Sequence, residues 1–226
     1  MSSRMITISD VHGCSVALKG LIEAIEPNEE DVLVFLGDYC DRGSDSKGVF
    51  DQIIELKNRC KVIPILGNHD EMMLVVRSNP SKVQAWLRCV GTSTLQSYGS
   101  DSDFTLIPES HLDFLQSCVR FFETDDHIFV HANYKPHLPM REQSGYSSRW
   151  LSLRDYVPPP HFSGKTVYVG HTSQKSREIL NLGHLVCIDT GCVYGGWLTA
   201  VDVHNGTVWQ ANEAGNLRTD FSSISG

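Results

Sequence analysis

Three short segments in the first 70 residues combine glycine with side chains that can bind a divalent metal ion. They are Asp10-Val11-His12-Gly13, Gly37-Asp38-Tyr39-Cys40-Asp41-Arg42-Gly43 and Gly67-Asn68-His69-Asp70. Each segment follows a short apolar run that is typical of a buried β-strand. Ligands bind beyond the carboxyl ends of the strands in open α/β sheets, so we expect the three segments to meet at one crevice.

Two strands predicted in the second half of the chain also end in a histidine, within Val130-His131-Ala132-Asn133 and Val169-Gly170-His171-Thr172. This mixed set of oxygen and nitrogen donors, without a thiolate, suits manganese, iron or zinc better than calcium or a structural zinc ion. We expect two divalent ions, with Mn²⁺ preferred and iron or zinc as alternatives. The candidate ligands are Asp10, His12, Asp38, Asn68, His131 and His171.

Two neighbouring metal ions indicate a particular chemistry. An aspartate can bridge them, because each of its two oxygens can bind one ion. Two ions about 3.5–4 Å apart can lower the pKa of a shared water, aim it for in-line attack and neutralise the charge that builds on a phosphoryl group. The pattern therefore predicts hydrolysis of a phosphate ester by direct attack of a water that bridges the metals.

The strength of this prediction lies in the combination of segments. Aspartate and histidine in a single turn more often cap backbone groups than bind metal. The second segment is more specific, since two carboxylates and an arginine between glycines have little structural reason to cluster. Five such segments, each at a strand end and in compatible order, are an improbable coincidence.

In these segments the chain resembles the phosphoprotein phosphatase family of calcineurin-like metallophosphoesterases. That family carries Gly-Asp-x-x-Asp-Arg-Gly and Gly-Asn-His-Glu/Asp blocks, preceded by Asp-x-His-Gly and followed by two histidine-bearing strands. The resemblance extends from Asp10 to beyond His171, most of the chain. It implies that Asp10 and His12 hold the first metal, that Asp38 bridges, and that Asn68, His131 and His171 hold the second.

The resemblance also implies roles for the remaining polar residues of the segments. His69 would be the general acid that protonates the leaving oxygen, with Asp41 orienting its ring. Arg42 would bind the phosphate, where a guanidinium matches two oxygens, and Asn68 would contact it as well. A second phosphate-binding arginine is expected between the two histidine strands. Arg149 and Arg154 are both available there, and we prefer Arg154, with a surface salt bridge as the alternative role.

The substrate is less well defined than the site. The block Ile188-Asp189-Thr190-Gly191-Cys192-Val193-Tyr194-Gly195-Gly196 resembles one shared by bacterial protein phosphatases of this family and symmetrical diadenosine tetraphosphate hydrolases. The compact length favours a serine/threonine protein phosphatase, with phosphotyrosine as a further substrate. Asp70 in place of glutamate is instead an argument for the symmetrical bis(5'-nucleosyl)-tetraphosphatase. An inactive metal-binding scaffold is the third hypothesis, but it would require a lost ligand or a lost His69.

The elements that must position these residues follow from hydrophobic periodicity. Residues 5–9, 32–36 and 62–66 predict strands, and residues 14–26 and 45–58 predict helices between them. Residues 70–120 predict several helices beside the sheet, and short strands follow from residue 128 to residue 210. We expect one α/β domain over residues 1–226. The resemblance implies a four-layer αββα sandwich with two mixed sheets and this helical insertion.

Composition narrows the class further. Nineteen basic and 27 acidic residues give a net charge of −8, which disfavours a nucleic-acid partner. The seven cysteines form no paired spacing, and the chain begins without room for a secretory signal. Its apolar runs are shorter than the roughly 20 residues that a membrane span requires. We therefore expect a cytoplasmic protein without a membrane or nucleic-acid partner.

Overall fold

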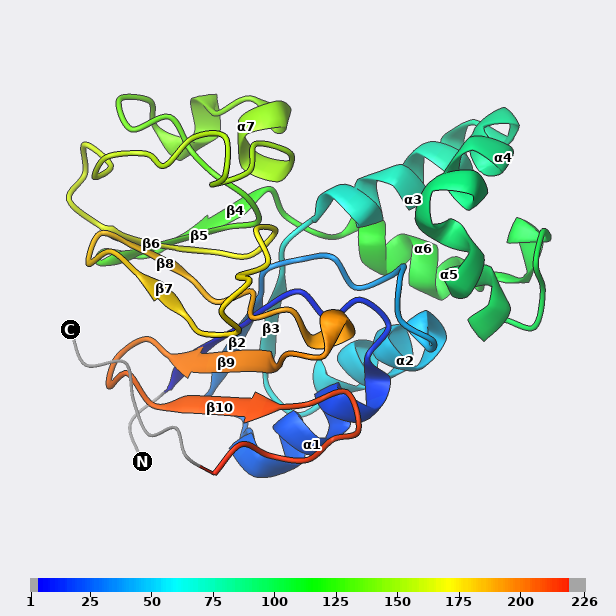
Figure 1. The fold of residues 1–226 in the computed structure, drawn as a ribbon, viewed down its shortest axis with the longest axis horizontal. Helices are drawn as coiled ribbons and strands as arrows, with labels where there is room; N and C mark the ends of the chain where they lie inside the picture. The colour runs from blue at the N-terminus through cyan, green and yellow to red at the C-terminus, as the bar shows by residue number, and fades with distance from the viewer. Residues whose placement is uncertain (1–3, 220–226) are drawn as a thin grey trace.

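The computed structural model describes residues 4–219, and its centre is a pair of five-stranded sheets packed face to face (Figure 1). The first sheet has the order β10-β9-β1-β2-β3, and the second has the order β4-β5-β6-β8-β7. The strands are β1 (Met5–Ile8), β2 (Val32–Phe35), β3 (Lys61–Pro64), β4 (Phe121–Glu123), β5 (His127–Val130), β6 (Thr166–Val169), β7 (Leu180–Asn181), β8 (Leu185–Cys187), β9 (Leu198–Asp202) and β10 (Val208–Ala211). Both sheets are mixed, as predicted.

The parallel strands of each sheet determine where the site can form. Strands β1, β2 and β3 are parallel, and so are β5, β6 and β8. Their carboxyl ends therefore lie at a common edge of the two sheets, where loops can approach one another. Every segment that the sequence singled out follows one of these six strands.

Alternating side chains of β2 explain why the sheets stack. Leu33 and Phe35 face the helices, whereas Val34 and Leu36 belong to the core between the sheets. Helices α1 (Ser15–Ile25) and α2 (Ser46–Leu56) cover the outer face of the first sheet. On the outer face of the second sheet, loops and the short helix α7 (Gly145–Arg149) form the last layer (Figure 1). The four-layer sandwich expected from the resemblance is confirmed.

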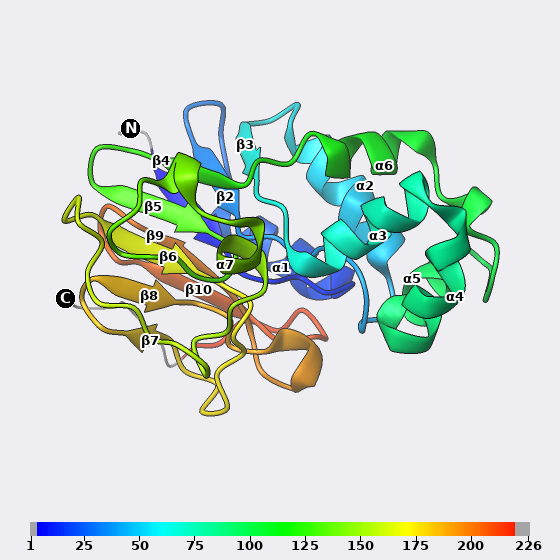
Figure 2. The same cartoon turned by 90° about the horizontal axis from the view of Figure 1, so that it is seen from above.

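The helical insertion lies to one side of the sheets, as Figure 2 shows from above. Its first helix starts at Asn68, two residues earlier than predicted, so two site residues occupy its first turn. The turn that joins α4 to α5 is π-helical, a geometry that occurs frequently at functional sites. The helices are α3 (Asn68–Ser78), η1 (Pro80–Lys82), α4 (Val83–Trp86), η2 (Leu87–Gly91), α5 (Thr92–Ser97), η3 (Phe104–Leu106) and α6 (Glu109–Gln116).

Several short elements escaped the sequence pattern. Strand β4 pairs with the edge of the second sheet, and β7 has two residues, too few for a periodicity to show. The remaining ones are α7, η4 (Met140–Glu142) and η5 (Cys192–Tyr194). Asn205-Gly206, a sequence typical of hairpin turns, joins antiparallel β9 and β10. Within residues 4–219, none of the helices has the length and apolar character needed to cross a membrane.

Candidate metal centre

The predicted ligands meet at the edge where the parallel strands end. Two clusters of candidate ligand atoms form there, and within each cluster the atoms lie within 4.8 Å of one another. One cluster contains His12, Asp38 and His69, and the other contains Asp38, His131 and His171. Asp38 belongs to both, which is the position expected of a bridging carboxylate.

The hydrogen bonds of His12 indicate which of its ring nitrogens could bind a metal ion. Nδ1 lies 2.9 Å from the carbonyl oxygen of Cys40, and because a carbonyl can only accept, Nδ1 carries the proton. Nε2 therefore presents a lone pair, which accepts from Arg42 Nη1 at 2.6 Å and lies 3.4 Å from Asp38 Oδ2. A basic nitrogen beside a carboxylate, with its other nitrogen on a carbonyl, is the arrangement of a metal-binding histidine.

The second cluster brings hydrogen-bond acceptors together. His131 donates through Nδ1 to the carbonyl of Leu36, and His171 donates through Nε2 to that of Trp150. The other nitrogen of each ring lies 3.0 or 2.9 Å from Asn68 Oδ1. In this arrangement three acceptor atoms face one another, and a cation is the group that satisfies them together.

The pKa values of the imidazoles favour metal over protons at this site. Burial lowers the pKa of His12 to about 3 and that of His171 to about 4, and burial also lowers the pKa of His131. These rings are therefore neutral near pH 7. A neutral imidazole is the form that binds a metal ion. The donor set thus fits the divalent ions that the sequence implies.

Buried carboxylates give a second reason to expect cations at this site. Asp10 is 3% exposed, and burial followed by the charges of Asp189 and Asp38 raises its pKa well above the usual range. Burial raises the pKa of Asp189 to about 6 against the opposing charges of Arg42 and Arg154. Asp10 belongs to neither ligand cluster, and its carboxylate accepts from the backbone N–H of His171 at 3.0 and 3.1 Å.

Left-handed backbone places the side chains of the turns. Non-glycine residues rarely adopt positive φ, so such conformations cost free energy and collect at functional sites. Glycines give the carboxylates room, because a Cβ at Gly67 would lie 2.1 Å from Asp38 Oδ1 and one at Gly170 would lie 2.0 Å from Asp10 Oδ1. The site residues with positive φ are His12, Asp38, Asp41, Arg42 and His171.

Asp70 holds the turn that carries Asp38. It is fully buried, and its oxygens accept from the backbone N–H groups of Asp38, Tyr39 and Gly67 at 2.8–3.0 Å. Burial raises its pKa to about 7. The contact with Gly67 also caps the first turn of α3. Asp70 therefore ties the second and third segments together.

The histidine next to Asn68 has different surroundings from the candidate metal ligands. His69 donates through Nδ1 to Asp41 Oδ2 at 2.8 Å, and both side chains are buried. Burial opposes a charged ring, but the nearby carboxylates of Asp38 and Asp41 outweigh it and raise the pKa of His69. A histidine that holds its proton near neutral pH can act as a general acid.

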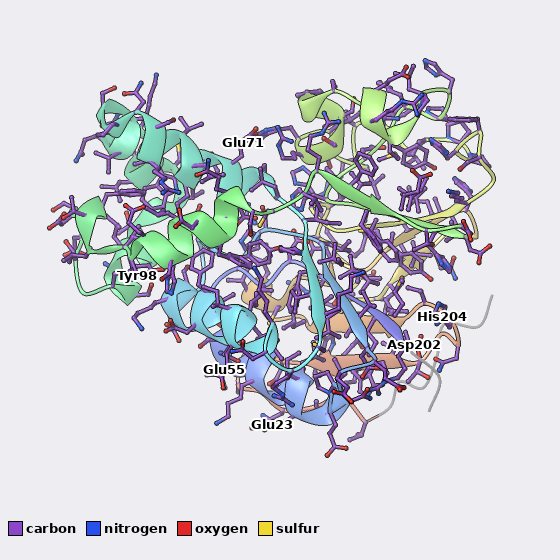
Figure 3. The ribbon with its side chains drawn as sticks, turned by 180° about the vertical axis from the view of Figure 1, so that it is seen from behind. Glu23, Glu55, Glu71, Tyr98, Asp202 and His204 are labelled. Atoms are coloured by element: carbon purple, nitrogen blue, oxygen red, sulfur yellow. The ribbon has the colours of Figure 1, made fainter. Side chains whose placement is uncertain are left out.

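The candidate phosphate-binding arginines differ in their partners. Arg42 is exposed and stacks over the Tyr194 ring at 5.5 Å. Arg154 is also exposed, and its Nη2 donates to the carbonyl of Ser173 at 2.6 Å. Arg149 forms an ion pair with Glu71, the residue labelled between the insertion and the α7 region in Figure 3. Its guanidinium charge is thus already neutralised.

Sequence reasoning missed several residues that contact the site. Asp189 had a signal, because it follows an apolar run in the same way as the predicted ligands. Trp86 is a buried aromatic residue of the kind that usually fills a core, but its Nε1 also donates to Asp41 Oδ2 at 3.3 Å. Thr94 donates to Asp41 Oδ1 at 2.7 Å, and no motif pointed to it.

Comparison with known proteins identifies the family of the chain. The family described as calcineurin-like phosphoesterase matches residues 3–175. A serine/threonine-protein phosphatase 1 from Salmonella typhimurium is 27% identical over 204 residues, covering 85% of this chain and 88% of that protein. An asymmetrical bis(5'-nucleosyl)-tetraphosphatase from Bacillus velezensis is 25% identical, and the match covers 85% of this chain and 86% of that protein. A symmetrical bis(5'-nucleosyl)-tetraphosphatase from a Janthinobacterium is 30% identical, but the match covers 57% of this chain and 43% of that protein.

Solved structures show the same fold. A candidate diadenosine tetraphosphatase superposes with a TM-score of 0.71 at 21% identity, over 98% of this chain and 96% of its own. A cold-active protein-tyrosine phosphatase of a Shewanella species gives a TM-score of 0.70 at 18% identity, over 97% and 80%. Fold and site together define a metal-dependent phosphoric ester hydrolase. The chain belongs to the calcineurin-like phosphoesterase family.

Proposed function

We propose that this metallophosphoesterase is a protein-serine/threonine phosphatase that also accepts phosphotyrosine, works with two Mn²⁺ ions and resides in the cytoplasm. The observation that carries the proposal is the buried His69–Asp41 pair beside two ligand clusters that share Asp38. A proton donor next to a centre for two cations matches the requirements of phosphomonoester hydrolysis. The whole-chain likeness to a serine/threonine-protein phosphatase supports this substrate class.

The ligands of the two ions follow from the donor set. Asp10 and His12 would hold the first, Asp38 would be shared, and the remaining three would hold the second. When bound, the two ions would supply an activated water and positive charge for the phosphoryl oxygens. The residues proposed for the second ion are Asn68, His131 and His171.

The other side chains bind the substrate and move a proton. Arg42 and Arg154 bind the phosphoryl oxygens, since both are exposed and carry no ion pair among residues 4–219. Asn68 contributes a further polar contact to the phosphate. Nε2 of His69 gives its proton to the leaving oxygen, while Nδ1 remains on Asp41. Since the leaving oxygen departs protonated, no alkoxide has to be released into water.

A symmetrical bis(5'-nucleosyl)-tetraphosphatase is the second candidate. Relatives with that activity in their names support it, although the first of them matches 57% of this chain. The asymmetrical tetraphosphatases match 85% and 86% of it, so dinucleoside polyphosphates of both cleavage patterns belong in the same test. A scaffold without activity is disfavoured because all six predicted ligands and His69 are present.

The test compares substrates on one manganese-loaded sample. Peptides carrying phosphoserine, phosphothreonine or phosphotyrosine are assayed beside diadenosine tetraphosphate, and kcat/KM is measured for each. We expect the phosphoserine and phosphothreonine peptides to give the highest values. A higher value for diadenosine tetraphosphate would contradict the proposed substrate and support the second candidate.

The proposed acid is tested on the same preparation. His69→Asn is expected to retain both metal ions and to lose roughly 100-fold or more in turnover, the usual contribution of a general acid. Metal content is measured by mass spectrometry beside the steady-state rate. Near-normal turnover would show that His69 is not the acid, even if the protein hydrolyses phosphate esters.

A further inference from the structure

Asp41, which orients the proposed acid, is itself held by the helical insertion. Its carboxylate has no exposed surface, and each oxygen needs a hydrogen-bond donor because a buried carboxylate without partners is costly. Oδ2 accepts from His69 Nδ1 at 2.8 Å. The other donors come from residues that follow Asp41 by 45 and 53 positions, in α4 and α5.

The Thr94 hydroxyl forms two hydrogen bonds with Asp41, one as donor and one as acceptor. Its hydroxyl donates to Asp41 Oδ1 at 2.7 Å and accepts from the backbone N–H of Asp41 at 2.9 Å. Ser46, at the start of α2, lies 3.2 Å from the same hydroxyl. Because Thr94 is fully buried, water does not compete for these bonds. Thr94 thus holds the carboxylate of Asp41 and, together with Ser46, its left-handed backbone.

Trp86 supplies the third donor, and its position depends on a glycine. The indole Nε1 donates to Asp41 Oδ2 at 3.3 Å, the oxygen that also accepts the hydrogen bond from His69 Nδ1. The ring packs edge to face with Phe104 at 5.8 Å. A Cβ on Gly91 would lie 2.3 Å from the indole, so the π-helical turn needs a glycine at this point.

We propose that Thr94 and Trp86 are positioning residues for general-acid catalysis, through which the helical insertion fixes the carboxylate that orients His69. Neither side chain is placed to touch the substrate; both act through Asp41. The larger effect belongs to Thr94, because its bond to the carboxylate is shorter and it also holds the backbone N–H. The proposal rests on the proposed function in one respect, the role of His69 as the acid.

The test uses two aryl phosphates that differ in their need for an acid. p-Nitrophenolate leaves readily without a proton, whereas phenolate is more basic and gains more from protonation. Thr94→Val keeps the size of the side chain and removes its hydroxyl. We expect a loss of roughly tenfold in kcat for phenyl phosphate, the effect of one hydrogen bond to a charged group, and little loss for p-nitrophenyl phosphate.

Matched variants separate positioning from general damage. Trp86→Phe keeps an aromatic ring and removes the N–H, and a smaller loss with the same substrate preference is expected. Thr94→Ser restores the hydroxyl and should recover most of the phenyl phosphate rate. Thr92→Val removes the exposed hydroxyl of the same helix, which bonds the carbonyl of Leu87 at 3.0 Å, and should change neither rate.

A double-mutant cycle with His69→Asn gives the decisive result. If Thr94 acts through His69, Thr94→Val causes no further loss once His69 is replaced. Equal losses for both esters, or losses that add to that of His69→Asn, would overturn the proposal. Should Thr94→Val fail to fold, the same cycle is run with Trp86→Phe. If His69→Asn alone leaves phenyl phosphate turnover unchanged, the acid assignment has failed and not merely the role of the insertion.

Discussion

The metal centre has two sides that are built in different ways. On the side of the strand ends, several residues in short turns adopt left-handed backbone. Glycines lie so close to the site carboxylates that a Cβ on the glycine would clash with them. On the side of the insertion, from residue 70 to residue 120, no described non-glycine residue has positive φ, and helices α4 and α5 contribute supporting donors. The difference teaches that strained turns place candidate metal ligands such as Asp38, whereas regular helices support the carboxylate next to His69, the proposed proton donor.

The comparison predicts that changes on the strand-end side remove metal and activity together. Asp38→Asn has the largest expected effect, because this carboxylate belongs to both ligand clusters. We expect metal content and turnover to fall together to background, measured by mass spectrometry and steady-state kinetics. Asp101→Asn, an exposed change in the insertion, is the control. An Asp38→Asn protein that retained two ions would contradict the bridging role.

Gly170→Ala tests whether the close approach to Asp10 is needed. The added methyl would lie 2.0 Å from Asp10 Oδ1, so the carboxylate has to move away from His171. A loss of roughly 10–100-fold in metal affinity is expected, as for other residues that orient metal ligands. Gly164→Ala is the control: a Cβ there would meet nothing within 4 Å, so only its positive φ should cost stability, about 1 kcal/mol, and metal affinity should stay unchanged. Equal metal affinities in Gly170→Ala and Gly164→Ala would show that the close approach of residue 170 to Asp10 is not needed.

The two arginines between the histidine strands give a smaller, more selective effect. Arg154→Met is expected to lower kcat/KM by roughly tenfold, since it removes a charged contact to phosphate and leaves the metal ligands intact. Arg149→Met breaks the ion pair with Glu71 that joins α7 to the insertion, and should mainly lower the melting temperature. If Arg149→Met has the larger effect on kcat/KM, the preference between the two arginines is reversed.

The smallest effect on activity is expected at Asp31, which lies on neither side of the candidate metal centre. Asp31 is buried, and its carboxylate accepts from the guanidinium of Arg4, which together with backbone bonds lowers its pKa. Asp31→Asn should cost about 1–2 kcal/mol of unfolding free energy at pH 7, a modest value because Arg4 is partly exposed and water screens its charge. Turnover should not change.

The pH dependence of that stability has a definite sign. The folded pKa of Asp31 lies below its unfolded value near 4, so the stabilisation is complete above about pH 4 and disappears as the pH falls through the folded value. Denaturant unfolding of both proteins from pH 7 downwards measures it. A difference between wild type and Asp31→Asn that grew as the pH fell would contradict the assignment.

The sequence alone determined which residues meet at the strand ends and what they can bind. That information is local, because each turn lies within a few residues of the strand that carries it and uses side chains with few other purposes. The general features of the helical insertion were local as well, since helical periodicity is visible within ten residues. Asn68 and His69 were recognised as site residues, although the start of α3 at Asn68 was not.

Only the tertiary structure decided how the insertion contacts the site. Trp86 and Thr94 read as an ordinary core residue and an ordinary helix residue, because the contacts that give them a role reach back 45 and 53 positions to Asp41. The Glu71–Arg149 pair spans 78 positions and gives one of the two candidate phosphate-binding arginines a partner within the protein. Periodicity describes the face of an element and not its partner, so such pairings emerge only when the packed chain brings the elements together.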